Sequence, residues 1–125
     1  MSNDQHQVLV VEDNMITALY YASVVEVMGL KVCGKAATAE QAIAMAANTH
    51  PAAILMDVRL RGSRDGIDAA ESIREAGDEP RIIYITGSNE PETMKRMNES
   101  NPAAILVKPV MAEQLERTLR KVLPH

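Results

Sequence analysis

The sequence predicts an α/β fold, a doubly wound sheet of parallel strands with helices on both faces. Short apolar runs bounded by polar residues, such as residues 8–11 and 53–56, are typical of buried strands. Longer segments with helical spacing lie between them, so strand and helix alternate five times. This alternation is typical of right-handed crossovers that join neighbouring parallel strands and cover both faces of the sheet.

Strands are expected over residues 7–11, 31–36, 52–56, 81–85 and 103–107. The first, third and fifth are the most apolar and are expected at the centre. The second carries Lys31 and Lys35 and is expected at an edge. The doubly wound order 2-1-3-4-5, that of a flavodoxin-like three-layer sandwich, places the switch point between the first and third strands.

Helices are expected over residues 14–28, 39–48, 67–76, 90–99 and 111–122. Asn14 can cap the first helix and Gly29 can end it, because these residue types favour the two ends of helices. The second helix must close before Pro51, since proline restricts the residue that precedes it.

The length of 125 residues predicts one domain, with a core over about residues 7–122. The chain stops soon after the last predicted helix, so no output domain is expected. A net charge of −4 and three aromatic residues, all Tyr, argue against direct nucleic-acid binding. No apolar run approaches the length of a membrane span and the N-terminus does not resemble a signal peptide, so a cytoplasmic protein without membrane insertion is expected.

Polar residues follow the apolar strands at the point where each strand ends. Glu12 and Asp13 follow the first strand, Asp57 the third, Thr86 the fourth and Lys108 the fifth. Because the carboxyl ends of parallel strands meet at one edge of the sheet, these side chains are expected in one crevice. Three carboxylates, a hydroxyl and an ammonium suit Mg²⁺ and a phosphoryl group.

These residue types also indicate roles. Two carboxylates about 4 Å apart repel by about 4 kcal/mol at an effective dielectric near 20, and a divalent cation relieves that repulsion. Asp57, at a rigid strand end, can attack phosphorus as a nucleophile. Lys108 and Thr86 can contact phosphoryl oxygens, and Pro109 indicates a fixed turn that aims the lysine.

The motifs VLVVEDN, ILMDVRL with the following DG, YITG and LVKPV resemble the signature of response-regulator receiver domains of two-component signalling. The resemblance spans about residues 7–122. It implies that Asp57 accepts a phosphoryl group from a phosphohistidine on a histidine kinase or a histidine phosphotransfer protein. It implies that Mg²⁺ binds Asp13, Asp57 and the backbone carbonyl of Arg59, with Glu12 acting nearby through water. It also implies that Thr86 and Lys108 contact the phosphoryl oxygens and that the Lys108–Pro109 bond is cis.

The sequence departs from the family pattern at several positions. Ile105 and Val110 stand where many receivers have aromatic residues, so any switch must use Thr86 and aliphatic repacking. The loop after Asp57 has Arg61 in place of a common proline and is about one residue longer than usual. Its arginines, Arg59, Arg61 and Arg64, can steer a phosphorylated partner, or simply form a solvated loop.

Two surfaces are candidate partner sites. In the first helix, one row of residues is assigned to the core: Ile16, Leu19, Tyr20, Ser23, Val24 and Val27. A second row is expected to dock against helices of the phosphodonor: Met15, Ala18, Ala22 and Val25, with Tyr21 beside them. The alternative for this row is a broad core face. On the second surface, Met94, Met97 and Ile105 are candidates for partner binding, and the alternative is ordinary packing against the sheet.

The leading interpretation is a stand-alone receiver that relays phosphate or regulates a downstream protein by docking. Such a domain catalyses only its own phosphorylation and slow dephosphorylation and is not a conventional enzyme. One alternative is a small Mg²⁺-dependent aspartyl phosphotransferase or phosphatase, which usually needs a second acid near the nucleophile, where this chain has Arg59. The other is a binding module that works without phosphorylation.

Overall fold

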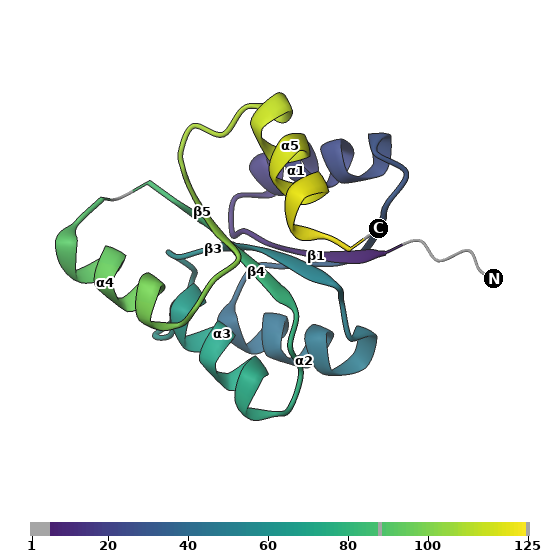
Figure 1. Ribbon diagram of the computed structural model, residues 1–125. Coiled ribbons are helices and arrows are strands. Elements are labelled where there is room, and N and C mark those ends of the chain that lie inside the picture. Colours follow the sequence, from purple (N-terminus) through teal and green to yellow (C-terminus); the bar gives the residue numbers. More distant parts are fainter. Residues whose placement is uncertain (1–5, 88, 125) are drawn as a thin grey trace.

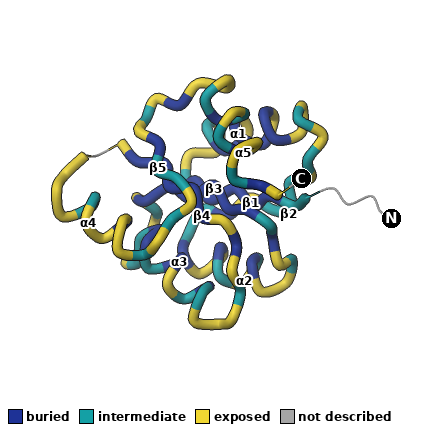
Figure 2. Tube along the Cα trace, in the orientation of Figure 1, coloured by how far each residue is buried: buried dark blue, intermediate teal, exposed yellow. Residues whose placement is uncertain are grey.

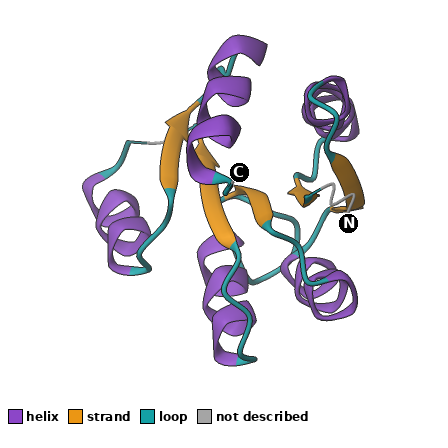
Figure 3. Ribbon diagram, turned by 45° about the vertical axis from the view of Figure 1, so that its right-hand side comes forward, coloured by secondary structure: helices purple, strands orange, loops and turns teal. Residues whose placement is uncertain are grey.

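A computed structural model describes residues 6–87 and 89–124 and confirms the predicted α/β class. Five parallel strands form one sheet in the order β2-β1-β3-β4-β5, with helices on both faces (Figures 1 and 3). The strands are β1 (Gln7–Val11), β2 (Lys31–Ala36), β3 (Ala53–Asp57), β4 (Arg81–Thr86) and β5 (Ala104–Val107). The helices are α1 (Met15–Val27), α2 (Ala39–Thr49), α3 (Gly66–Glu75), α4 (Pro91–Glu99) and α5 (Ala112–Val122).

Two apolar cores lie on opposite faces of the sheet, because successive side chains of a strand point to opposite sides. Helices α1 and α5 pack on the face that contains Val10 and Leu55. Helices α2, α3 and α4 pack on the face that contains Leu9 and Met56. The central strands are therefore buried between two helical layers (Figure 2).

The predicted element boundaries agree with the structure to within one residue. Asn14 caps α1 by accepting a hydrogen bond from the backbone N–H of Thr17 at 3.0 Å. Gly29, which follows α1, has a φ of +83°, a conformation that other residues rarely adopt. Among the described residues, no helix is both long and apolar enough to cross a membrane.

The predicted position of β2 at an edge is confirmed, whereas the central position expected for β5 is wrong. Strand β4 lies between β3 and β5, in agreement with the predicted order 2-1-3-4-5, and its residues Ile82–Thr86 are buried. The short strand β5 is covered only in part, and Val107 is 50% exposed. An apolar run this short does not separate a central strand from an edge strand, because both bury at least one face.

The core side of α1 is the opposite of the predicted one. The buried residues are Ala18, Tyr21, Ala22, Val24 and Val25, so the row expected to dock a partner lies in the core except for Met15. Of the row assigned to the core, only Val24 is buried. The helix is apolar on all sides, so periodicity could not orient it. The structure turns Ala18 and Ala22 inward together with the large side chain of Tyr21.

The second candidate surface also packs inward. Met97 is fully buried, and Met94 and Ile105 are partly buried against the same core. The packing alternative is therefore confirmed for Met97, whereas Met94 and Ile105 stay candidates for partner binding. Apolar side chains on α4 and β5 serve first to cover the sheet, because that burial is the main source of stability.

Candidate functional site

The carboxyl ends of the strands form a crevice of about 670 Å³. All six residues predicted from the strand ends and the following loop line it: Glu12, Asp13, Asp57, Arg59, Thr86 and Lys108. The sequence reasoning missed other lining residues as site components, namely Asn14, Thr17, Val58, Asp65, Gly87, Glu90 and Thr93. Only their position in the sequence could have indicated these residues, because they lie in the loops after β1, β3 and β4 or in the first turn of the following helix.

A carboxylate is buried directly after the end of β1. Glu12 is 4% exposed, and its backbone N–H donates to the carbonyl of Ala36 at 2.9 Å, which extends the ladder to β2. One carboxylate oxygen, Oε2, accepts from the backbone N–H of Asn14 at 3.1 Å. The turn into α1 therefore orients Glu12 toward the crevice.

The end of β3 is held by the start of α3. Asp57 is the last residue of β3 and is 4% exposed. The backbone N–H of Gly66 donates to the carbonyl of Val58 at 2.8 Å. A Cβ atom on Gly66 would lie 2.1 Å from the carbonyl oxygen of Asp57, so only glycine permits this approach. The backbone that carries the Asp57 carboxylate thus packs against the start of α3.

Lys108 joins the two buried carboxylates. Its Nζ lies 3.2 Å from Oε1 of Glu12 and 3.2 Å from Oδ2 of Asp57. Its backbone N–H donates to the carbonyl of Thr86 at 2.8 Å, which ties β5 to β4 beside the crevice. The Lys108–Pro109 peptide bond is cis, as expected. Thr86 itself is 2% exposed.

The pKa values in the crevice reflect burial and close charges. Burial raises the pKa of Glu12 to about 7, despite the hydrogen bond from Asn14 and the nearby ammonium group, and the charge of Asp57 adds to the increase. Burial alone would lower the pKa of Lys108, but the negative charges of Asp57 and Glu12 outweigh it and raise this pKa. One ammonium group therefore does not neutralise the carboxylates around it.

The donor set of the crevice fits a hard divalent cation. One carboxylate oxygen from each of Glu12, Asp13 and Asp57 lies within 4.8 Å of the others. Carboxylate oxygens are preferred ligands of Mg²⁺. Three acids facing one lysine leave a surplus of negative charge, which a divalent cation would offset.

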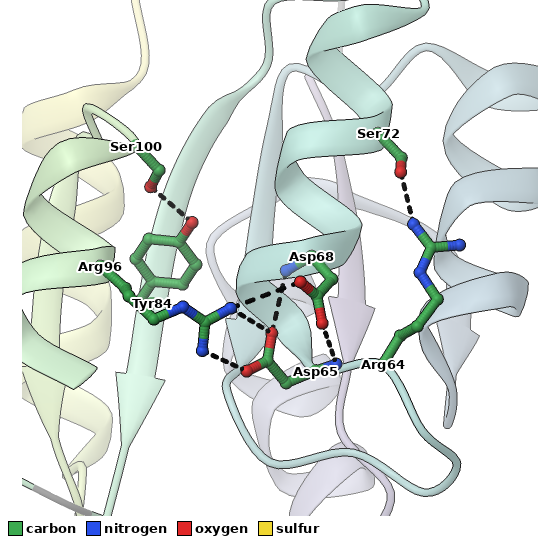
Figure 4. Close-up of polar contacts among 7 residues, drawn as sticks. All are labelled: Arg64, Asp65, Asp68, Ser72, Tyr84, Arg96 and Ser100. Atoms are coloured by element: carbon green, nitrogen blue, oxygen red, sulfur yellow. Dashed lines mark hydrogen bonds and ion pairs between the residues drawn. The ribbon is translucent and has the colours of Figure 1, made fainter. Parts of the chain in front are cut away.

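The rim of the crevice is connected to α4 by ion pairs. Asp65 and Asp68 form a reciprocal capping box at the start of α3. Nη1 of Arg96, on α4, lies 2.8 Å from Oδ2 of Asp65, and its Nη2 lies 3.4 Å from Oδ1 of Asp68 (Figure 4). Burial opposes ionisation of Asp65, but the hydrogen bonds from Arg96 and from the Asp68 backbone outweigh it and lower its pKa.

Asp65→Asn is expected to lower the free energy of unfolding by about 1 kcal/mol at neutral pH, because the pair is partly exposed and Asn still caps a helix. The folded-state pKa of Asp65 lies below its ordinary value of 3.8. The ion pair of Asp65 with Arg96 therefore contributes fully to the free energy of unfolding at pH values above that ordinary pKa. This contribution is lost as the pH falls through the lower folded-state pKa. Urea unfolding at a series of pH values should show the difference between the two proteins vanish in acid. A difference that is independent of pH would contradict this assignment.

Two further contacts in Figure 4 bear on the predicted switch and the basic loop. The buried hydroxyl of Tyr84 lies 2.7 Å from Oγ of Ser100, at the end of α4. An aromatic residue of β4 thus contacts the C-terminal end of α4, whereas positions 105 and 110 hold Ile and Val. Nη2 of Arg64 donates to Oγ of Ser72 at 2.5 Å, so Arg64 is engaged with α3. Arg59 and Arg61 remain exposed.

Comparison with known proteins identifies the class that this fold and crevice define. The family model for the response regulator receiver domain matches residues 8–120, so the chain belongs to the receiver-domain family of two-component signalling. The predicted resemblance is confirmed, as is the flavodoxin-like strand order. Receiver domains of response regulators are in general signalling domains.

Curated relatives include the transcriptional regulatory protein PdtaR of Mycobacterium tuberculosis, 29% identical over 109 residues, which are 87% of this chain and 52% of PdtaR. The phyllosphere-induced regulator PhyR of Methylorubrum extorquens is 27% identical over 94% of this chain and 43% of PhyR. The chain thus spans about half the length of the curated relatives it matches.

Among solved structures, the signal receiver domain of a modulated diguanylate cyclase from Desulfovibrio desulfuricans is 34% identical, with a TM-score of 0.86. The alignment covers 95% of this chain and 94% of that domain. The chemotaxis protein CheY4 of Vibrio cholerae has a TM-score of 0.87 at 24% identity, covering 96% of this chain and 100% of CheY4, and supports the fold alone.

Proposed function

We propose that Asp57 accepts a phosphoryl group from a phosphohistidine on a histidine kinase or a histidine phosphotransfer protein. The observation that carries this proposal is the placement of the Asp57 carboxylate. It is buried at a strand end, 3.2 Å from the Lys108 ammonium and within one cluster with Glu12 and Asp13. Because a histidine kinase obtains phosphate from ATP, this function places the chain in the cytoplasm.

The chemistry follows from the groups in the crevice. A carboxylate oxygen of Asp57 forms a bond to phosphorus while the phosphorus–nitrogen bond of the donor breaks, and its electron pair stays on the imidazole nitrogen. Lys108 holds Asp57 in position through Oδ2 and places a positive charge where phosphoryl oxygens arrive. Thr86, at the end of β4, offers a hydroxyl at the same edge.

The residues that would hold Mg²⁺ are Asp13 and Asp57, with the backbone carbonyl of Arg59 and with Glu12 acting through water. Bound Mg²⁺ would neutralise the negative charge of the carboxylates and of the phosphoryl oxygens. The phosphorylated domain then relays the group or docks on a downstream protein. On this proposal it does not turn over free phosphoesters, since the crevice presents Arg59 rather than a second acid two residues after Asp57.

The test is incubation with acetyl phosphate and Mg²⁺ followed by intact-mass measurement. The protein is expected to gain the mass of one phosphoryl group. Removal of divalent cations with a chelator should reduce the rate of this gain by about 10²-fold or more, because the acidic cluster would then repel the incoming anion. A gain of equal rate with and without chelator would contradict the metal site. A second measurement uses phosphorylated histidine kinases as donors.

A further inference from the structure

The crevice contains more acidic than basic side chains. The described residues that line it include five acids and two basic residues: Glu12, Asp13, Asp57, Asp65, Glu90, Arg59 and Lys108. Lys108 is already paired with Glu12 and Asp57, and Arg59 is exposed. A phosphodonor brings further negative charge to this crevice. Any contact that cancels the charge of one of its acids therefore affects how readily the donor enters.

Arg96 contacts one of these acids from outside the crevice. Its Nη1 lies 2.8 Å from Oδ2 of Asp65 and its Nη2 lies 3.3 Å from Oδ1, a contact with both carboxylate oxygens (Figure 4). Asp68 at 3.4 Å and the charge of Glu71 also act on Arg96. Asp65 lines the crevice, whereas Arg96, Asp68 and Glu71 do not. The charge of Asp65 is thus offset by a cation that does not itself occupy the crevice.

Helix α4 is held in the position that presents Arg96 to Asp65. Met97, the residue after Arg96, is fully buried in the core between the sheet and the helices. At the C-terminal end of α4, the side chain of Arg74 on α3 donates to the backbone carbonyl of Ser100. These contacts do not involve Asp65. Removal of the Asp65 charge should therefore leave α4 in place, and the effect of the charge can be separated from the position of the helix.

We propose that Arg96 is a positioning residue of the phosphorylation reaction, which acts through Asp65 by cancelling one negative charge of the crevice. This inference rests on the proposed function, because it concerns the entry of an anionic phosphodonor and the binding of Mg²⁺. Without Arg96, the uncompensated carboxylate of Asp65 would repel the donor and attract the cation. The same ion pair therefore affects the two ligands of the crevice in opposite directions.

The test measures two quantities for Arg96→Gln. The dissociation constant of Mg²⁺, measured by isothermal titration calorimetry on the unphosphorylated protein, is expected to fall by about threefold to tenfold, because the variant has one more uncompensated negative charge near a divalent cation. The rate of phosphorylation by acetyl phosphate at saturating Mg²⁺ is expected to fall by a similar factor, since that charge repels the donor. A purely structural role of Arg96 would instead weaken Mg²⁺ binding, because a displaced site binds the cation less well.

The double variant Arg96→Gln with Asp65→Asn separates the effect of charge from that of structure. It lacks both members of the ion pair, so the Mg²⁺ dissociation constant and the phosphorylation rate should return to within about twofold of the wild type. Arg120→Gln is the matched control. Arg120 is paired with Glu116 on α5, on the other face of the sheet, and its loss changes the net charge of the chain by the same amount. It should leave both quantities unchanged.

Three results would overturn the proposal. One is an Arg96→Gln protein that binds Mg²⁺ more weakly and is also phosphorylated more slowly. Another is an Arg96→Gln protein in which neither quantity changes. The third is a double variant that behaves like Arg96→Gln alone. Failure of the proposed function is a separate result, in which the wild type gains no phosphoryl group. The Mg²⁺ titrations would then still decide whether Arg96 sets the charge of the crevice.

Discussion

Asp57→Asn is expected to abolish the Mg²⁺-dependent gain of a phosphoryl group, with a fall in rate of at least about 10³-fold. An amide oxygen is a far weaker nucleophile than a carboxylate oxygen, and the amide cannot form a stable acyl phosphate. The side chain keeps its size, so Asn fits the buried position that Asp57 occupies at the end of β3. Intact-mass measurement after exposure to acetyl phosphate reads the result directly.

Asp13→Asn is the matched control for this change. Asp13 belongs to the same acidic cluster but does not make the 3.2 Å contact with Lys108 that Asp57 makes. Its variant should still be phosphorylated, more slowly and with a higher requirement for Mg²⁺, because one ligand of the cation is weakened. An Asp57→Asn protein that gains phosphate as fast as the wild type would place the acceptor at another residue.

Gly66→Ala is expected to destabilise the protein by about 2–4 kcal/mol, although alanine is the better residue in most helices. The added Cβ would lie 2.1 Å from the carbonyl oxygen of Asp57 and 2.9 Å from Cγ of Met56. The first neighbour is backbone, so the start of α3 or the end of β3 must move. Urea unfolding should show a lower midpoint, and phosphorylation of Asp57 should slow because its strand end is displaced.

Gly87→Ala provides the comparison for Gly66→Ala. Gly87 also lines the crevice, but the nearest atom to an added Cβ is Cδ of Lys108 at 3.9 Å, an ordinary contact distance. The free energy of unfolding of this variant should lie within about 0.5 kcal/mol of that of the wild type. Equal stability of the two variants would show that the close approach of Gly66 to Asp57 does not constrain the site.

The crevice could be predicted from the sequence because the carboxyl ends of parallel strands lie at the same edge of the sheet. Glu12, Asp57 and Lys108 are far apart in the sequence, yet each follows an apolar run, and such runs enter the sheet in the same direction. The contacts of Lys108 with two carboxylates follow from that arrangement. The ion pairs of Arg96 with Asp65 and Asp68 were not predicted, because they depend on how α4 sits beside α3 and no sequence spacing encodes that distance.

The order of the elements, their boundaries and the residues at the strand ends were determined by the sequence alone, because local patterns and chain direction specify them. The tertiary structure decided which side of α1 is buried. Ala18 and Ile16 are both apolar, so hydrophobicity does not distinguish the inner side from the outer side. The buried side holds the large side chain of Tyr21 as well as Ala18 and Ala22, so the choice depends on how the side chains of α1 fit together with the sheet and α5.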